Sequence, residues 1–401
     1  MEKRIVRTGE FKFSDEEKRI MSDILDSGRI TEHIHTQEFE RNWAKEVGTH
    51  YAIAVNSGTS ALITGILSLK YLYGDDKRKK IITTPLTYIA DSNAIKICGF
   101  EPVYADIEDD GFNISPSGIE KILSEQDPSE FFGILPVHLF GYPFKINEIK
   151  DITKKYGLYL MEDCAQAHGS TYDGKKVGSF GNFSIFSFYV AHNVQAGEMG
   201  VMNTDSIKIR NMGRSVKANG RSCTCDICDR MHGNCPQKDK SDGEDDMDPR
   251  FTHNVIGYNF KTTEFPAALA NHRIQFIDEI NKARRENVAY LNEGLKNHEN
   301  VLRLPEYSEN VSYLAYPLVL KKGNLDNLRT KLGDLGVETR TAFGCIPLQQ
   351  PSFAYLKKEY EGKLPNAENI GKNGFYLGGH QSLTKEDLDY VIDSFNKVLK
   401  Y

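Results

Sequence analysis

The sequence predicts an α/β protein with a large domain built on a mostly parallel sheet and a smaller α/β domain after it. Between residues 51 and 203, short apolar runs alternate with helical patterns. Such alternation is typical of a parallel sheet covered by helices on both faces. After Pro266 the pattern changes to one long amphipathic helix. Two capping boxes mark the first and the last helix.

The elements of the large domain follow in chain order. Ser14 and Glu17 form the first capping box, which predicts a helix running to about Asp26. Six apolar runs are then expected to be buried strands, at 51–55, 80–84, 99–107, 132–139, 158–163 and 183–189. Ligands of such sheets bind at the C-terminal ends of the strands. The polar residues that follow these runs are therefore the candidate site.

The C-terminal part carries the signals of a second domain. Apolar residues from Ile277 to Leu295 fall on one face of a long helix. A strand at 315–320 and a last helix capped by Thr384 follow. We therefore expect a large domain over 1–270, with a cysteine-rich loop over 221–250 inserted in it, and a small domain over 271–401.

Composition excludes some classes of protein. The 401 residues carry a net charge of −6 with a pI near 6.0, whereas a nucleic-acid surface needs a basic stripe. No run approaches the roughly 20 apolar residues that a membrane-spanning helix requires. We expect a soluble, cytoplasmic protein that binds neither nucleic acid nor membrane.

Four of the seven cysteines lie within thirteen residues. They are Cys223, Cys225, Cys228 and Cys235. Clustered thiols in a cytosolic enzyme usually bind a metal, and their spacing alone favours structural zinc over an iron–sulfur cluster. Cys164, considered alone, is expected to be a buried thiol.

Three motifs carry chemistry. The turn at 56–60 stands between a strand and a helix and can present backbone N–H groups to a phosphate. Asp163 ends another strand, where it could pair with a protonated pyridine nitrogen. His192 lies in the segment 187–200 and can move a proton. Other histidines, among them His138 and His168, are expected to be hydrogen-bonded structural residues.

Taken together, these segments resemble the DegT/DnrJ/EryC1/StrS group of vitamin-B6 sugar enzymes, which have the fold-type-I aminotransferase architecture with a seven-stranded sheet. The resemblance spans nearly the whole chain, through 27–33, 57–62, 84–95, 162–169, 187–200 and 256–265. It implies pyridoxal or pyridoxamine 5′-phosphate as cofactor and a homodimer. The implied cofactor-binding residues are Ser57, Gly58, Thr59 and Ser187 for the phosphate, Tyr88 stacked on the ring, Asp163 at its nitrogen, Gln166 lining it, and Asn259 reaching the neighbouring subunit.

His192 stands where these enzymes carry the lysine that holds the cofactor as a Schiff base, which an imidazole cannot form. This change resembles the dehydratases of the group. They remove the C3 hydroxyl of a nucleotide-linked 4-keto-6-deoxyhexose with pyridoxamine phosphate. The resemblance implies that His192 and Asp163 are the catalytic residues.

Two dehydratase branches resemble this chain, and the cysteines favour one of them. The branch similar to CDP-4-keto-6-deoxyhexose 3-dehydratase carries an iron–sulfur cluster, expected here as [2Fe–2S]. Its cysteine spacing resembles Cys164, a gap of 58 residues, Cys223 and Cys225, with Cys235 or Cys228 as the fourth ligand. That branch implies a ferredoxin or a flavin/iron–sulfur reductase as electron donor. The alternative is a cluster-free, glutamate-dependent 3-dehydratase or an aminotransferase-like enzyme, with zinc in the cysteine loop.

Overall fold

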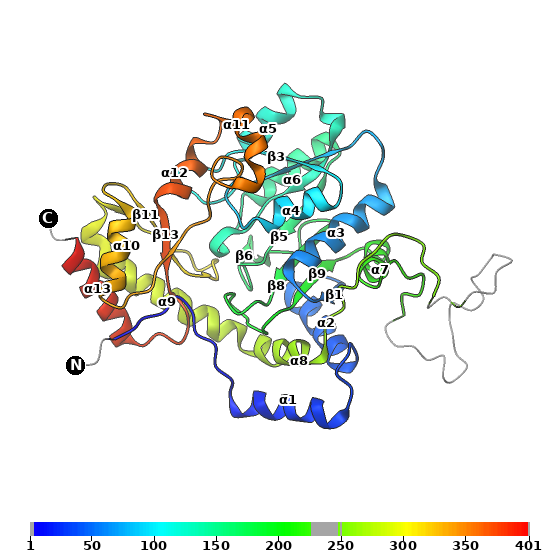
Figure 1. Cartoon of the computed structure of the whole chain (residues 1–401), viewed down its shortest axis with the longest axis horizontal. Coiled ribbons are helices and arrows are strands. Elements are labelled where there is room, and N and C mark those ends of the chain that lie inside the picture. The colour runs from blue at the N-terminus through cyan, green and yellow to red at the C-terminus, as the bar shows by residue number, and fades with distance from the viewer. Residues whose placement is uncertain (1–3, 226–247, 249–250, 400–401) are drawn as a thin grey trace.

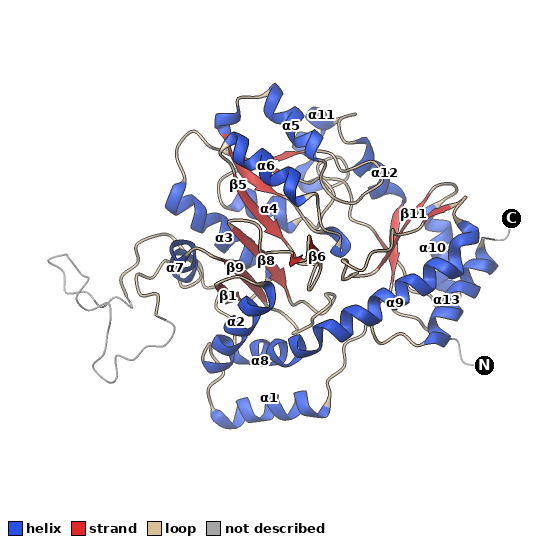
Figure 2. Cartoon of the chain, turned by 180° about the vertical axis from the view of Figure 1, so that it is seen from behind, coloured by secondary structure: helices blue, strands red, loops and turns tan. Residues whose placement is uncertain are grey.

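The computed structural model of the chain describes residues 4–225, 248 and 251–399, and it contains two sheets with helices around each (Figures 1 and 2). Cys228 and Cys235, two of the expected metal ligands, lie outside the described residues. No described helix combines the length and the apolar character needed to cross a membrane.

The large sheet has seven strands in the order β1-β9-β8-β5-β4-β2-β3. Its strands are β1 Tyr51–Val55, β2 Lys80–Thr83, β3 Glu101–Tyr104, β4 Phe131–Leu135, β5 Tyr159–Asp163, β8 Phe183–Ser187 and β9 Gly200–Thr204. β9 runs antiparallel to both of its neighbours, and the other pairings are parallel. The predicted α/β fold with a mostly parallel seven-stranded sheet is therefore confirmed.

Helices cover both faces of this sheet (Figure 2). They are α1 Asp15–Ser27, α2 Ile34–Val47, α3 Gly58–Tyr73, α4 Ala90–Ile97, α5 Pro116–Glu125, α6 Ile146–Tyr156, α7 Ile207–Val216 and α8 Glu264–Arg273. A small hairpin, β6 Thr171–Tyr172 with β7 Lys175–Lys176, follows β5. The Ser14 capping box is present at α1, as predicted.

The second sheet is antiparallel, in the order β10-β11-β13-β12. It comprises β10 Leu302–Arg303, β11 Tyr316–Leu320, β12 Arg340–Thr341 and β13 Gly374–Leu377, accompanied by α9 Ile277–Leu295, α10 Leu325–Asp334, α11 Lys357–Tyr360, α12 Pro365–Asn373 and α13 Lys385–Val398. The long helix, the strand and the final capping box predicted from the sequence are all present. Val6 joins this apolar core and bridges to Val337, so the start of the chain crosses to the second sheet. A domain boundary at residue 270 stays a prediction.

Two strands are shorter than the apolar runs suggest. The run 132–139 is a regular strand only as far as Leu135, because Pro136 has no N–H to donate to a neighbouring strand, although Val137 still bridges to Asp163. The run 99–107 is a strand only over β3, after which Asp106 turns its carboxylate to the backbone of Asn366 and Ala367 at the start of α12.

A remote carboxylate fixes the start of α2. Glu264, the first residue of α8, accepts hydrogen bonds from the backbone N–H groups of His33, His35 and Thr36 at 2.7–3.1 Å, and one from the Thr36 hydroxyl at 2.6 Å. Helix N-termini have unpaired N–H groups and favour negative charge. His33 is the N-cap residue, but its side chain makes no capping hydrogen bond. The buried carboxylate of Glu264, which is 1% exposed, caps the helix instead.

Candidate active site

The phosphate-binding candidates from two distant segments meet at the C-terminal edge of the large sheet. A Cβ placed on Gly58 would lie 2.8 Å from the Cβ of Ser187, and one placed on Gly200 would clash with the carbonyl oxygen of Ser57. Ser187 and Gly200 are directly paired across β8 and β9. The turn after β1 therefore packs against the end of β8, with glycine required at the contact.

This contact builds a polar cradle at the start of α3. Ser57 is the N-cap residue, and its hydroxyl accepts a hydrogen bond from the Ser60 N–H at 3.1 Å. Gly58 and Thr59 form the first turn, and both are half-buried. The start of α3 is bordered by hydroxyl groups, and Gly58 has no Cβ where the helix lies closest to Ser187. Such a helix N-terminus is suited to bind an anion such as a phosphate.

Asp163 lies at the end of β5 and is 5% exposed. The N–H of Ala165 donates to its Oδ1 at 2.7 Å. Burial raises the pKa of its carboxyl, against the hydrogen bonds and the nearby His138, which lower it. Gln166 is held close by, because its Oε1 accepts the N–H of Phe140 at 2.8 Å. A buried carboxyl of this kind can bind a protonated ring nitrogen.

The aromatic and inter-subunit candidates are exposed. Tyr88 is 61% exposed, with its ring edge-on to Phe343 at 6.2 Å between centroids. A tyrosine presented in this way offers a ring face for a flat ligand. Asn259 is exposed as well, and its backbone bridges to Ala218.

His192 lies in the loop between β8 and β9, where its backbone N–H donates to the Tyr189 carbonyl at 2.9 Å. Burial lowers the pKa of its imidazole to about 4, with a smaller contribution from the Arg284 guanidinium. Its Nδ1 is buried and makes no hydrogen bond to any described residue. The imidazole is therefore neutral at physiological pH and able to accept a proton. No lysine lies between Ser187 and Gly200.

Sequence reasoning missed the residues that hold this loop. Asn193 is 1% exposed and donates from Nδ2 to the Ser312 carbonyl at 2.8 Å. Arg284, in α9, donates to the carbonyls of Tyr313 and Leu314 at 3.1 and 2.8 Å. Both anchor to the segment that precedes β11. Their sequence context gives no signal, because each is a single polar residue whose partners are far along the chain.

The two predicted structural histidines differ. His138 is hydrogen-bonded, as expected, whereas His168 has both ring nitrogens buried without a well-formed hydrogen bond among the described residues. Its ring lies among Trp43, Phe186 and Phe188, and 6.2 Å from the ring of His192. Burial lowers the pKa of His168 well below its usual value, which keeps its ring neutral beside His192.

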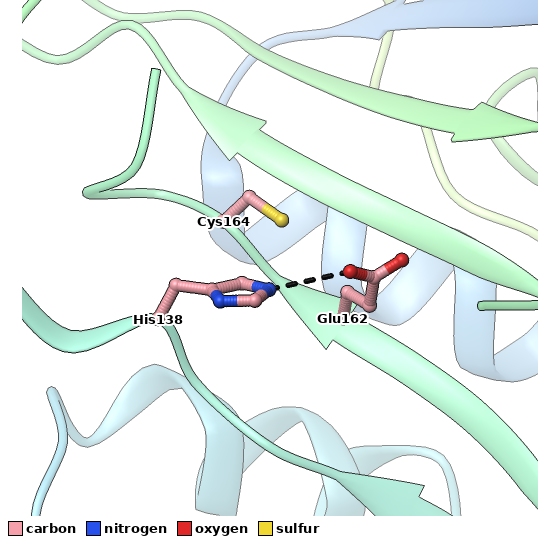
Figure 3. Close-up of side chains that lie close together, drawn as sticks. All are labelled: His138, Glu162 and Cys164. Atoms are coloured by element: carbon pink, nitrogen blue, oxygen red, sulfur yellow. Dashed lines mark hydrogen bonds and ion pairs between the residues drawn. The ribbon is translucent and has the colours of Figure 1, made fainter. Parts of the chain in front are cut away.

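Cys164 groups with His138 and Glu162, their ligand atoms lying within 4.8 Å of one another (Figure 3). Within this group, His138 and Glu162 belong to one hydrogen-bond network. The Phe144 N–H donates to Nδ1 of His138, which leaves its Nε2–H facing Glu162 at 3.2 Å. The carboxylate of Glu162 also accepts three backbone N–H groups, from Gly178, Phe180 and Gly181. Burial raises the pKa of the Cys164 thiol well above its usual value. These hydrogen bonds hold the side chains of His138 and Glu162 in place.

The expected cluster ligands are not gathered in the described part of the chain. Cys164 is fully buried after β5, whereas Cys223 and Cys225 are half-buried, and the three sulfur atoms do not form one group there. Cys223 and Cys225 follow α7, where the chain leaves the body of the large domain (Figure 1).

Comparison with known proteins agrees with this fold. Residues 12–396 match the DegT/DnrJ/EryC1/StrS aminotransferase family, and the chain belongs to it. It is 30% identical to the lipopolysaccharide biosynthesis protein RfbH of Salmonella typhimurium, covering 95% of this chain and 89% of the relative. It is 29% identical to GDP-perosamine synthase of Escherichia coli O157:H7, covering 95% of each.

A solved structure gives the same fold. The E. coli GDP-4-keto-6-deoxy-D-mannose-3-dehydratase with bound hydrated PLP superposes with a TM-score of 0.83 at 23% identity, over 99% of this chain and 100% of that one. The fold-type-I architecture expected from the sequence is thus confirmed. The proteins similar to this chain include a perosamine synthase and a dehydratase. Overall similarity therefore does not assign one activity to this chain, and the residues of its own site must be compared.

Proposed function

We propose that this protein is a pyridoxamine-phosphate-dependent C3 dehydratase of a nucleotide-linked 4-keto-6-deoxyhexose. The observation that carries the proposal is His192, a half-buried, neutral imidazole in a loop without lysine. An aminotransferase of this architecture needs a lysine amine to anchor its cofactor, whereas a histidine supplies only a base. The chemistry is then proton movement on a cofactor held without a covalent bond.

The residues present fit this cofactor. Ser57, Gly58, Thr59 and Ser187 would hold the phosphate at the start of α3, where a Cβ on Gly58 would fill the cradle. The exposed ring of Tyr88 would stack on the pyridine, and Gln166 would line it. Asn259 would reach the phosphate of a second subunit in a homodimer.

Two residues of the chain would perform the chemistry. When bound, pyridoxamine phosphate supplies an amine that condenses with the C4 ketone and a ring that accepts electrons. Asp163 would keep the ring nitrogen protonated, which makes the ring a better electron acceptor. His192 would take a proton from C4′ and, once protonated, assist the departure of the C3 hydroxide.

Incubation with pyridoxamine phosphate and a nucleotide-linked 4-keto-6-deoxyhexose tests the proposal. We expect loss of the C3 hydroxyl, followed by mass spectrometry, and none of it in H192N. In H192K, borohydride treatment with pyridoxal phosphate should attach the cofactor to the new lysine while dehydration is lost. Dehydration at the wild-type rate in H192N or H192K would refute the assignment of the base.

The electrons for reductive deoxygenation are a separate part of the proposal. The cysteine spacing favours a [2Fe–2S] cluster with Cys164, Cys223 and Cys225 as ligands and Cys235 or Cys228 as the fourth, reduced by a ferredoxin or a flavin/iron–sulfur reductase. The sulfur atoms of Cys164, Cys223 and Cys225 do not form one group among the described residues, so the roles proposed for His192 and Asp163 are independent of the cluster.

Anaerobic purification with iron and sulfide analysis tests the cluster. Iron and sulfide in stoichiometric amounts, lost in C225S, would support it. Zinc without sulfide, together with turnover supported by glutamate and no reductase, would support the second candidate, a cluster-free dehydratase. That candidate is favoured by the separation of Cys164 from Cys223 and Cys225.

A further inference from the structure

The loop that carries His192 is closed by hydrogen bonds at its base and across its middle. At the base, the N–H of Ala196 donates to the Phe188 carbonyl at 2.7 Å. Across the middle, Nε2 of Gln195 donates to the Val190 carbonyl at 2.5 Å. His192 lies between the two ends of this second bridge, so the Gln195 side chain fixes the shape of the segment that presents the imidazole.

Arg273, the last residue of α8, holds Gln195 from outside the loop. Its Nη1 donates to the Gln195 carbonyl at 3.1 Å and to Oε1 of the same residue at 3.4 Å. The other nitrogens donate to the Glu17 carboxylate, at 2.5 Å from Nε and 3.2 Å from Nη2, and Nη2 also donates to the Lys12 carbonyl at 2.8 Å. A planar guanidinium presents its donors in fixed directions. One side chain therefore ties the loop to α1 and to the segment before it.

The contribution of Arg273 to the loop is one of direction. Its positive charge is paired with Glu17, and the two side chains are only 13% and 6% exposed. Such a largely buried pair contributes little net stability, because both charges lose their water. The Phe11 ring lies 4.6 Å from the guanidinium and limits its movement further. The group is thus held in place by contacts on α1 and before it, and its remaining donor faces the loop.

Close packing does not hold the outer side of the loop. Asn193, Gln195 and Arg273 line a cavity of about 150 Å³, together with Phe276. Side chains beside such a space can change rotamer without a clash, and segments with few packed neighbours open at low free energy. The hydrogen bonds of Gln195 to Arg273, and of Asn193 to the Ser312 carbonyl, therefore keep the imidazole in one place.

We propose that Arg273 is a positioning residue for His192, which acts through Gln195 and is itself fixed by Glu17. This role rests on the proposed function, because a base must lie within hydrogen-bonding reach of the atom whose proton it takes. A displacement of about 1 Å can lower a rate about a hundredfold. The residues that contact Arg273 lie outside the set proposed to bind the cofactor, so it influences the reaction through the loop.

Amide hydrogen exchange and steady-state kinetics of the full-length protein test this role in R273A, Q195A and the double variant. We expect exchange in the segment 189–196 of R273A to rise at least about tenfold, with exchange in β4 and β5 unchanged. With pyridoxamine phosphate and a nucleotide-linked 4-keto-6-deoxyhexose, kcat should fall about tenfold or more while KM stays within about twofold. The loss of kcat in the double variant should be smaller than the product of the two single losses, because both changes break one connection.

R329A is the matched control. Arg329 is also half-buried, and it donates to the hydroxyl and the carbonyl of Thr339 at 3.1 and 3.3 Å. It lies in α10, beside the second sheet. This variant should lower the free energy of unfolding in urea without raising exchange in the segment 189–196 or lowering kcat.

The outcomes separate the role of Arg273 from the proposed function. Wild-type exchange in the segment 189–196 of a folded R273A would overturn the role, as would raised exchange with an unchanged kcat, or single losses that multiply in the double variant. If R273A does not fold, Q195A decides in the same way, because it leaves the pair of Arg273 and Glu17 intact. Absence of dehydration by the wild type would instead overturn the proposed function, while raised local exchange in R273A would still identify Arg273 as the anchor of the loop.

Discussion

The protonation of His192 offers a quantitative test that needs no substrate. Burial and Arg284 lower the pKa of its imidazole from 6.5 to about 4 in the folded protein. At about 1.4 kcal/mol per pKa unit, charging this side chain costs about 3.4 kcal/mol more in the folded than in the unfolded chain. Between pH 6.5 and 4 the unfolded chain therefore binds a proton that the folded chain does not. The contribution of His192 to stability is complete above pH 6.5 and is lost as the pH falls through this window.

Urea unfolding of the wild type and of H192Q measures this contribution. Glutamine is polar and uncharged throughout, so the variant lacks the linkage. We expect the free energy of unfolding of H192Q, relative to the wild type, to rise by about 3 kcal/mol between pH 7.5 and pH 4. Because His192 contributes to the lowered pKa of His168, the comparison is repeated in an H168N background, where only position 192 differs. NMR of the ring protons should place the midpoint of His192 near the same low pH.

The reasoning would be refuted by a His192 midpoint near pH 6.5 together with a pH-independent difference between the two proteins. Such a result would mean that the imidazole is solvated, and that it enters the reaction as a cation at mildly acidic pH. The site would then supply an acid first and a base second.

Three further predictions concern the supports of the site. G58A places a Cβ 2.8 Å from that of Ser187, so pyridoxamine phosphate should bind about tenfold more weakly by calorimetry, while G9A, with open space around it, should bind normally. Q166A leaves a buried N–H without its acceptor and should lower the free energy of unfolding by about 1–3 kcal/mol in urea. E264A removes the acceptor of four hydrogen bonds at the start of α2 and should lower the free energy of unfolding by about 3 kcal/mol. E264Q should lower it by an intermediate amount. A decrease below about 1 kcal/mol in E264A would contradict the capping role.

The sequence predicted most of the strands because their apolar runs are bounded by turns. It could not supply the sheet order, and the approach of Gly58 to Ser187 depends on that order. β9 was not predicted, because its five residues end in the polar Asn203 and Thr204 and do not form a clear apolar run. Its antiparallel direction could not be predicted either, because only the pairing with its neighbours sets it.

The capping of α2 by Glu264 has a consequence for the order in which the chain acquires structure. The carboxylate and the N–H group of His33 are 231 positions apart. A ribosome adding about 5–20 residues per second needs roughly 10–50 s to pass from one to the other. During synthesis the first turn of α2 therefore waits, uncapped, until most of the large domain has been made. The amino-terminal segment is among the first to be synthesised and among the last to be fixed in place.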